Sequence, residues 1–301
     1  MQSIKAKVLT VFMSVIMVFS MFPALSSNAA TGSGSCGASA YWNLDNNGVL
    51  KITGSGDIAD YQLGKNTNGL EMTNAPWYQY RSSIKTVVIG PNITRIGNNA
   101  FGWCSSITSV QFQGTNVKSI GVAAFYETIA LKSIAIPQGV ASLGKWCFYY
   151  SGLTSVTLPT TLKVIAYGAF ANCKLIKVYL PAGVTTIGDF AFRSNYNMVR
   201  CSGGAGLVTI GTQAFEHCWK LSYFAITSKK LKKIGKACFL CDSKLKTIYI
   251  KQTTKLTKKG VKNSMYLSSV KKVKVKKSKV KKYKKYFTYR NCAKRGVKVK
   301  K

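Results

Sequence analysis

Acidic residues and histidine are scarce in this sequence. Its 301 residues include 8 Asp and Glu and one histidine, His217, against 44 Lys and Arg. General acid–base catalysis and metal binding both depend on clusters of carboxylates and imidazoles, so most hydrolytic and metalloenzyme chemistry lacks its usual residues here. Catalysis by His217 would need a nucleophile and an orienting group beside it. We interpret this histidine instead as a surface residue on a turn between repeats.

Asp57 and Asp60, in the stretch GSGDIADY, are the two acids that lie closest together. They could form a general acid–base pair or supply ligands for calcium, and an exported hydrolase would depend on them. Carboxylates in a turn rich in Gly and Ser more commonly accept hydrogen bonds from backbone amides. We therefore expect no enzymatic activity, no metal site and no cofactor.

Long apolar runs are absent except near the N-terminus. The run from Val8 to Phe22 has 15 residues, fewer than the roughly 20 that span a bilayer as a helix. Lysines precede this run, and Ser27-Asn28-Ala29 offers the small residues that a signal peptidase requires. We predict a signal peptide at residues 1–29, secretion, and no transmembrane span after cleavage; an uncleaved anchor is the alternative.

Repetition is what the sequence has in abundance. Phenylalanines recur every 22 to 24 residues, and an aliphatic residue lies five positions before each one, followed by Gly except at Ala166. These phenylalanines, here called the anchor phenylalanines, are Phe101, Phe125, Phe148, Phe170, Phe192, Phe215 and Phe239. A second aliphatic pattern at positions 0, +3 and +5 precedes most units, as in Leu153, Val156 and Leu158.

Periods of about 20 to 29 residues with this aliphatic spacing are typical of leucine-rich repeats, which stack short coils into a solenoid. Each copy has about six apolar anchors, worth roughly 1.5–3 kcal/mol each when buried. That gain cannot offset about 1–2 kcal/mol of backbone entropy for every ordered residue, so a single copy needs neighbours. We predict a right-handed, mostly β solenoid of about nine coils, with one short parallel strand and one helical turn per coil.

The stretch LPTTLKVIAYGAFANC, from Leu158 to Cys173, resembles the BspA-type, or spirochaete-type, leucine-rich repeats of bacterial surface proteins. The resemblance covers about residues 84–275, and APWYQYRSSIKTVVI from Ala75 is similar to the segment that precedes the repeats in those proteins. It implies a secreted or surface-displayed, non-enzymatic protein with a role in adhesion to host matrix proteins or to other cells.

The repeat pattern divides the mature chain into three parts. Residues 30–83 are expected to form an N-terminal capping segment, because apolar alternation on both sides of Asn46-Asn47-Gly48 predicts a β-hairpin that could cover the first coil. The repeat array is predicted at residues 84–250. Residues 251–301 are predicted to form a basic C-terminal cap that contains a degenerate last repeat.

Within this C-terminal cap the apolar residues keep a period. Val270, Val273 and Val275 predict a ninth strand, and Val297 and Val299 predict a final one. Between them, Val280, Tyr283 and Phe287 have the spacing of one helix face, and we expect Ser278 to be its N-cap.

Strand positions +2 and +4 should point away from the core, because +3 and +5 point into it. In the second half of the array these outward positions hold large residues, namely Lys177, Tyr179, Arg200, Tyr223 and Tyr249. Tyr and Arg are frequent at interaction hot spots, so we select these five as candidate ligand-binding residues. The alternative is that they are ordinary occupants of an exposed strand face.

Nine cysteines in an exported chain could form disulfides. Five of them, however, occupy fixed repeat positions: Cys104, Cys173 and Cys218 follow an anchor phenylalanine by three residues, and Cys147 and Cys238 precede one directly. We interpret these as small buried hydrophobic residues. Cys238 and Cys241 also spell CxxC, a weak signal of redox or metal chemistry, and the odd total leaves at least one thiol free or paired between chains.

Positive charge is concentrated at the C-terminus, where residues 251–301 carry 21 Lys and Arg and no acid. The candidate polyanion-binding residues are Lys271, Lys272, Lys274, Lys276, Lys277, Lys281, Lys282, Lys284 and Lys285. Lysine predominates over arginine, which favours diffuse attraction to anions over sequence-specific recognition of nucleic acid. A solvated lysine face without a dedicated partner is the alternative.

These observations predict a secreted, surface-associated binding or adhesion module. Its expected ligand is a host or bacterial surface protein, or an anionic wall polymer such as teichoic acid. The alternative function is that of a structural cell-wall component that is retained electrostatically. The sequence does not indicate whether the protein is a monomer or an oligomer.

Overall fold

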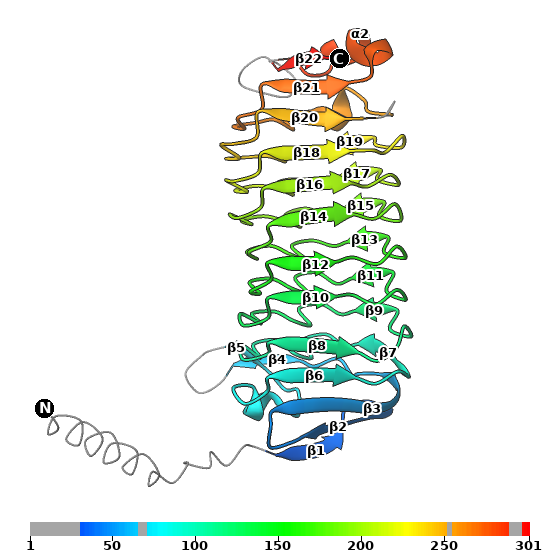
Figure 1. Cartoon of the computed structure of the whole chain (residues 1–301), viewed down its shortest axis with the longest axis vertical. Helices are drawn as coiled ribbons and strands as arrows, with labels where there is room; N and C mark the ends of the chain where they lie inside the picture. The colour runs from blue at the N-terminus through cyan, green and yellow to red at the C-terminus, as the bar shows by residue number, and fades with distance from the viewer. Residues whose placement is uncertain (1–30, 66–70, 252–254, 289–296) are drawn as a thin grey trace, which may run out of the picture.

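The structure, a computed structural model, describes residues 31–65, 71–251, 255–288 and 297–301. The predicted signal peptide at residues 1–29 lies outside the described residues. Figure 1 shows the chain wound into a stack of coils that runs from the blue hairpin at one end to the orange helix at the other. The stack has about nine turns, parallel strands and little helix, so the predicted solenoid is confirmed.

One strand from each coil enters a parallel array that faces the viewer in Figure 1, here called the front sheet. Its strands are hydrogen-bonded in three groups, β6 with β8, β10 with β12, and β14 to β22, and the residues at positions 0, +3 and +5 are buried in most coils. The predicted strands are confirmed, including the last two. The strands are β6 (Thr86–Ile89), β8 (Ser109–Phe112), β10 (Ser133–Ala135), β12 (Ser155–Thr157), β14 (Lys177–Leu180), β16 (Arg200–Gly203), β18 (Tyr223–Ile226), β20 (Thr247–Ile250), β21 (Lys272–Val275) and β22 (Lys298–Lys300).

The helical turn expected in each coil is wrong. In its place each coil has a second short strand followed by tight turns, and the aliphatic residue five positions before the anchor phenylalanine is buried in that strand. These strands form a second parallel sheet, the side sheet, made of β7 (Ile93–Ile96), β9 (Ser119–Ile120), β11 (Ser142–Leu143), β13 (Val164–Ile165), β15 (Thr186–Ile187), β17 (Thr209–Ile210) and β19 (Lys233–Ile234).

Tight turns complete each coil, and they explain why no helix forms. Trp146 and Tyr150, two residues on either side of Phe148, have φ of 55° and 54°, whereas a helix needs right-handed φ throughout. The amides of these three residues donate to carbonyls of the next coil at 2.9–3.0 Å. Hydrogen bonds between coils therefore replace the bonds within a helix.

The glycine that follows the aliphatic residue of the side sheet is required by close stacking. A Cβ atom at Gly144 would lie 2.4 Å from the carbonyl carbon of Gly121 in the preceding coil, and one at Gly211 would lie 2.4 Å from that of Gly188. No side chain fits at that distance, so glycine is required at these two positions; Ala166 is the one copy that differs.

The anchor phenylalanines form a continuous stack through the core. Trp77 begins it, and each successive pair of rings up to Phe239 has centroids 5.1–5.9 Å apart and ring planes within 21° of parallel. All these rings are fully buried. We call this stack the aromatic spine; its regular 22 to 24 residue period is what the sequence shows as the repeat.

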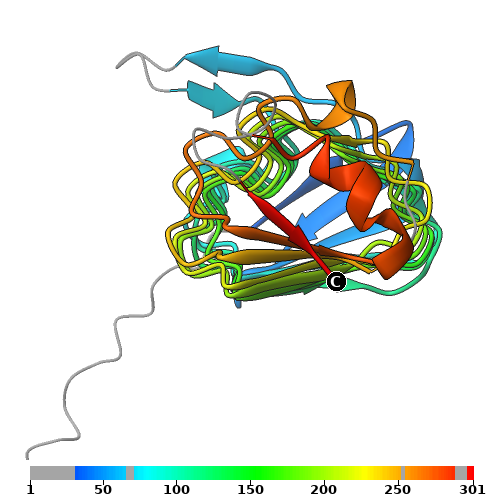
Figure 2. The same cartoon turned by 90° about the horizontal axis from the view of Figure 1, so that it is seen from above.

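The N-terminal hairpin is confirmed as antiparallel strands β2 (Ser39–Leu44) and β3 (Val49–Asp57), with β1 (Gly32–Ser35) paired to β2. β3 also pairs in parallel with β6 and β7, so one strand begins both sheets. A second hairpin, β4 (Leu63–Lys65) and β5 (Glu71–Thr73), projects from the ring of coils in Figure 2. That the first hairpin is needed as a cap stays a prediction.

At the other end, helix α2 (Val280–Lys284) lies across the last coil, as Figure 2 shows, and Tyr283 and Phe287 are buried. The N-cap expected at Ser278 is wrong. Ser278 lies inside a 3₁₀ turn, Lys277–Lys279, and the helix begins after Lys279 with no hydrogen bond from a capping side chain. The 3₁₀ turn continues directly into the helix, so no extended capping residue separates Ser278 from it; the extended residue, Lys276, lies before the turn.

A column of small polar or sulfur-containing residues is buried three positions after the anchor phenylalanines. The Sγ of Cys173 donates to the carbonyl of Phe148 at 3.0 Å, and the Nδ2 of Asn195 donates to that of Phe170 at 2.8 Å. Burial raises the pKa of Cys104 and Cys173 to about 12, so both stay protonated. The column contains Cys104, Thr128, Ser151, Cys173, Asn195, Cys218 and Asp242. The interpretation of the repeat cysteines as buried packing residues is confirmed, and all eight cysteines in the described ranges are free thiols.

Asp242 is the acid in this column. Its Oδ1 accepts the amide of Cys218 at 2.8 Å, but its Oδ2 has no partner among the described residues and the side chain is fully buried. Burial raises the pKa of Asp242 well above its usual range, the amide of Cys218 lowers it, and the nearby Glu216 carboxylate raises it again. The folded state therefore favours a proton on this carboxyl.

Replacement of Asp242 by asparagine is expected to raise the free energy of unfolding at pH 8 by about 1–3 kcal/mol, because the wild-type carboxyl must take up a proton when it is buried at that pH, whereas the amide is neutral in both states. The folded pKa exceeds the unfolded one, so folding takes up a proton and wild-type stability falls as pH rises from about 4 toward the folded value. The introduced amide would keep the acceptor for Cys218 and remove this dependence.

Urea unfolding at pH 5 and pH 8 measures both effects. The matched control is Asp189→Asn, because Asp189 is exposed and its Oδ1 acceptor for the amide of Thr212 would be retained. A variant less stable than wild type at pH 8 would contradict the protonation of Asp242.

Candidate ligand-binding face

The front sheet gathers the five candidate residues on one face. In register, Lys177 lies beside Arg200, and Arg200 beside Tyr223. Tyr249 lies beside Lys274 on the next strand. Lys177, Tyr179 and Arg200 are exposed, and Tyr223 and Tyr249 are half-buried. The predicted outward orientation of these side chains therefore holds. We call the outward side of β14 to β22 the ligand-binding face, after the role that the sequence predicts for it.

Three of the candidates form a series of side-chain contacts, and a lysine of the next strand extends this series. The guanidinium carbon of Arg200 lies 3.9 Å from the ring centroid of Tyr223. The rings of Tyr223 and Tyr249 stack with centroids 5.3 Å apart, and the Nζ of Lys274 lies 6.0 Å from the Tyr249 ring. Such contacts contribute about 0.5–1.5 kcal/mol each. They hold the two rings in place before any ligand binds.

Lys177 and Tyr179 lie on the flank of this series. Tyr179 is 72% exposed, the most exposed of the large apolar and aromatic side chains in the described residues. Ser202 is its neighbour on β16. A ring with a small neighbour offers most of its area to a partner, and burial of that area would be favourable.

Lysines cover the C-terminal end of the same face. Lys272 lies directly opposite Lys298, and Lys274 opposite Lys300, and all four are exposed. Like charges opposite each other on paired strands are destabilising, and residues 251–301 contain no acid to compensate. An anionic ligand would relieve this repulsion.

Lys298 and Lys300 were not among the residues selected from the sequence. The sequence does indicate them, because the alternation of Val297 and Val299 predicts a strand on which Lys298 and Lys300 point outward. Both valines are buried and both lysines are exposed, as that alternation requires.

The other basic candidates lie at the end of the solenoid. Lys271, Lys276 and Lys277 flank β21, and Lys281, Lys282, Lys284 and Lys285 lie on or next to α2; all seven are exposed. A hollow with a cavity volume of about 320 Å³ lies where the tyrosine and lysine candidates meet, and it is lined by Tyr249, Ile250, Lys251, Lys274, Val275 and Lys276. The tyrosine and lysine candidates thus share a border.

The remaining candidates from the sequence are structural. The Oδ1 of Asp60 accepts the amide of Asn98 at 2.7 Å and the Nη2 of Arg95 at 2.5 Å, and Asp57 accepts the hydroxyl of Thr94 at 2.5 Å. Partial burial would raise the pKa of Asp60, but the bonds from Asn98 and Arg95 lower it. These carboxylates tie the N-terminal segment to the first coil.

His217 and the CxxC motif likewise lack the geometry of a reactive site. His217 is half-buried with its ring against Trp219, at a centroid distance of 6.3 Å. Cys238 is in the core, whereas Cys241 is exposed. Within the described ranges, no group of three or more His, Cys, Asp or Glu could hold a metal ion, and no helix there has the length and hydropathy to cross a membrane.

Parallel strands stacked in coils, with aliphatic and aromatic anchors at a fixed period, define a leucine-rich repeat solenoid. The sequence model of the family described as BspA type Leucine rich repeat region matches residues 74–199 and 169–294, with 6 copies. The chain belongs to this family, which confirms the resemblance seen in its repeats. Leucine-rich repeat solenoids are generally non-enzymatic.

Several solved structures are similar to this chain. A leucine-rich repeat protein from Bacteroides ovatus ATCC 8483 is 19% identical with a TM-score of 0.48, covering 79% of this chain and 70% of that chain. The T. pallidum leucine-rich repeat protein is 27% identical with a TM-score of 0.45, covering 60% and 86%. A leucine-rich cell surface protein from Faecalibacterium prausnitzii A2-165 is 17% identical with a TM-score of 0.35, covering 81% and 89%. No curated protein matches the sequence.

Proposed function

We propose that this protein is a secreted, surface-associated binding module without enzymatic activity, which holds an anionic ligand on its ligand-binding face. The observation that carries this proposal is the contact series of Arg200, Tyr223, Tyr249 and Lys274, which continues into the paired lysines of β21 and β22. Family membership supports it, because leucine-rich repeat proteins typically bind proteins.

The ligand is an acidic region of a host or bacterial surface protein, or an anionic wall polymer such as teichoic acid. Stacked tyrosines beside an arginine favour a protein, because such residues dominate protein interfaces. The lysines suit either ligand: neighbouring strands lie about 4.8 Å apart, and alternate residues along a strand about 7 Å apart. The ammonium groups of the four paired lysines on β21 and β22 can therefore bind successive anionic groups of one ligand chain.

A structural wall component is the second candidate function, and the complete lack of acids in residues 251–301 favours it. Retention by charge alone would disappear in moderate salt, because exposed charges are screened beyond about 8 Å at physiological ionic strength. A protein ligand that contacts the tyrosines would keep affinity at high salt. Binding to purified cell walls and to immobilised host matrix proteins across a salt series separates the two functions.

Replacement of both Tyr223 and Tyr249 by alanine is expected to lower affinity for a matrix protein at least about 30-fold in 1 M NaCl, because truncation of even one hot spot costs about 2 kcal/mol or more. Wall retention at low salt should be unchanged. Tyr41→Ala is the control, since Tyr41 is 53% exposed on the N-terminal hairpin. Should the wild type hold no matrix protein in 1 M salt, the wall-component function would replace the adhesion module.

Point variants suit this test better than removal of residues 251–301. That deletion would take away β21, which pairs with β20 along its whole length, and the buried side chains of Val261 and Met265. It would expose a strand edge and part of the core, so lost binding could reflect unfolding.

A further inference from the structure

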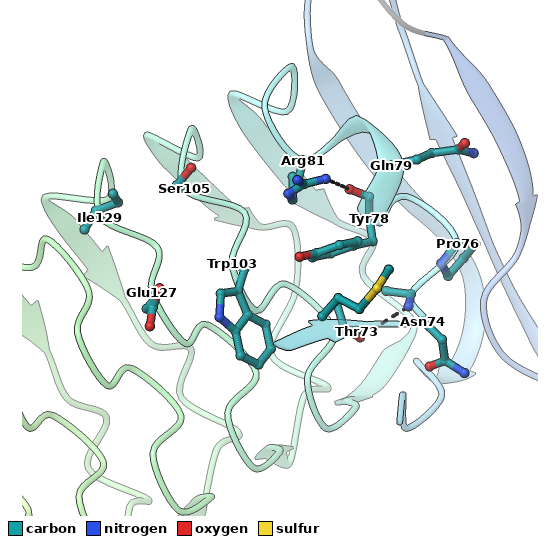
Figure 3. A pocket seen from close by; sticks show the side chains of 12 residues that line it. Thr73, Asn74, Pro76, Tyr78, Gln79, Arg81, Trp103, Ser105, Glu127 and Ile129 are labelled. Atoms are coloured by element: carbon teal, nitrogen blue, oxygen red, sulfur yellow. Dashed lines mark hydrogen bonds between the residues drawn. The ribbon is translucent and has the colours of Figure 1, made fainter. Parts of the chain in front are cut away.

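A groove opens beside the N-terminal coils, where the β4 and β5 hairpin joins the solenoid (Figure 3). Its cavity volume is about 950 Å³, within the roughly 300–1,000 Å³ of pockets that enclose small ligands. Its walls come from residues 72–81 and from the turns of two successive coils, at residues 103–105 and 127–129. These turns lie outside the front sheet, so the groove is separate from the ligand-binding face.

Two aromatic rings, Tyr78 and Trp103, point into this groove from neighbouring segments (Figure 3). The Trp103 ring is supported by Tyr126, with centroids 4.9 Å apart, and Tyr126 in turn stacks on Tyr149 at 5.0 Å. The amide of Trp103 donates to the carbonyl of Tyr126 at 2.7 Å. The ring orientation is therefore fixed before a ligand arrives, which lowers the entropy lost on binding.

Arg81 holds the second ring. Its guanidinium carbon lies 4.5 Å from the Tyr78 ring centroid, and its Nη1 donates to the carbonyl of Tyr78 at 3.3 Å. Arg81 is itself exposed. A guanidinium has five N–H donors in a planar fork, so Arg81 keeps donors for a ligand that packs on the ring below it.

The charge of the groove differs from that of the rest of the chain. Arg81 and Glu127 are the only charged side chains among the twelve described residues that line it, and their charges cancel. The whole chain carries a net charge of +36. Polyanions will therefore concentrate at the C-terminal lysines, and the groove suits an uncharged ligand. Thr73, Asn74, Gln79 and Ser105 add polar groups to the lining.

We propose that this groove binds a neutral glycan, a short segment of hexose or N-acetylhexosamine units. A sugar ring has an apolar face of C–H groups that can pack on Tyr78 and Trp103, and hydroxyls around its edge. The planar guanidinium of Arg81 presents paired hydrogen-bond donors that match adjacent hydroxyls, and Glu127 adds a carboxylate to the lining. The site is independent of the ligand-binding face and of the function proposed for it.

Isothermal titration calorimetry of the mature full-length protein tests this site. The titrants are trisaccharides of glucose, galactose, mannose and N-acetylglucosamine, in 0.5 M NaCl to screen the lysines. We expect at least one to bind with a Kd of about 0.1–1 mM, or roughly −4 to −5.5 kcal/mol. Trp103→Ala should weaken that binding about tenfold or more, which is the size of a lost stacking contact that dominates a weak site.

Trp219→Ala is the matched control, because Trp219 is 50% exposed on another turn and contacts Tyr196 in the same way, at 4.4 Å. Its Kd should stay within about twofold of wild type. Gln79→Ala gives a second test that leaves folding intact, since Gln79 is exposed in the groove wall; it should weaken binding about threefold, the effect of one hydrogen bond of roughly 0.5–1 kcal/mol.

Three outcomes would overturn the proposal. The first is that none of the four trisaccharides produces binding heat with the wild type. The second is that a trisaccharide binds to Trp103→Ala and to Gln79→Ala as tightly as it binds to the wild type. The third is that an acidic sugar, trigalacturonate, binds in 0.5 M NaCl while the neutral sugars do not, which would assign recognition to charge.

Discussion

Replacement of Phe170 by alanine is expected to lower the free energy of unfolding by about 3–5 kcal/mol, the usual cost of removing a buried phenylalanine. Phe170 is fully buried at the middle of the aromatic spine. Its ring centroid lies 5.3 Å from that of Phe148 and 5.5 Å from that of Phe192, at interplanar angles of 2° and 7°. The variant would lose both contacts and leave a cavity between two coils. Urea unfolding followed by circular dichroism measures the loss.

The repeat architecture makes this position more sensitive than a core residue of an ordinary domain. Each coil contacts only its neighbours, so stability is close to a sum of coil and interface contributions. Loss of Phe170 weakens the interfaces on both sides. We therefore expect the transition to broaden, because the two halves of the array no longer unfold together.

Two variants control for this prediction. Phe170→Leu keeps an apolar side chain and should cost about 1–1.5 kcal/mol. Tyr167→Ala alters an aromatic residue of the same coil that is 38% exposed; it removes ring contacts with Trp146 and Phe190 worth about 0.5–1.5 kcal/mol each and should cost less than Phe170→Ala. A loss below about 1 kcal/mol for Phe170→Ala would mean that the spine does not hold the coils together.

The spine also explains which parts of the fold the sequence predicts. Each anchor ring contacts the ring of the next coil, so the spacing between successive anchor phenylalanines equals the length of one coil. The repeat is therefore visible in the sequence itself. The strands of the front sheet follow from aliphatic residues at +3 and +5, because alternate residues of a strand point to opposite faces. The final strand at Lys298–Lys300 obeys the same rule.

The turns could not be predicted in this way. Trp146 and Tyr150 adopt positive φ, although bulky residues rarely do so without glycine's freedom. Their amides are satisfied by carbonyls of the next coil, at Tyr167 and Ala171. The hydrogen bonds that decide the conformation therefore join residues about 21 positions apart, and no local pattern reports them.

The candidate sites, too, could be predicted only as far as local patterns in the sequence report them. Alternation places Arg200, Tyr223 and Tyr249 on one face, but their contacts depend on the register between strands. The groove depends on how residues 72–81 lie against the turns of the first coils, which brings together Tyr78 and Trp103 from separate segments. Trp103 lies two residues after an anchor phenylalanine, a position that other coils fill with varied residues, and no motif marks it or Tyr78 as a binding residue.

Replacement of Lys272, Lys274, Lys298 and Lys300 by threonine is expected to weaken binding to inorganic polyphosphate and to purified teichoic acid about 1,000-fold in 0.15 M NaCl. A lysine near an anionic surface contributes about 1 kcal/mol, and each 1.4 kcal/mol corresponds to a factor of about ten. Threonine favours strands, and its introduction removes the repulsion between Lys272 and Lys298. The variant should therefore be at least as stable as wild type, so lost binding cannot be attributed to unfolding.

The arrangement of these lysines, rather than their number, is what the control variant tests. Threonine at Lys229, Lys230, Lys232 and Lys233 removes the same charge from exposed positions away from the ligand-binding face. If binding follows net charge, both variants will lose affinity equally, because long-range attraction depends on the total charge. If the four lysines of β21 and β22 bind successive anionic groups, only the variant with threonine at these four positions will lose most of its affinity. Its affinity will also depend less on salt concentration than that of the wild type. Equal losses would contradict a binding face and leave diffuse attraction to the whole chain.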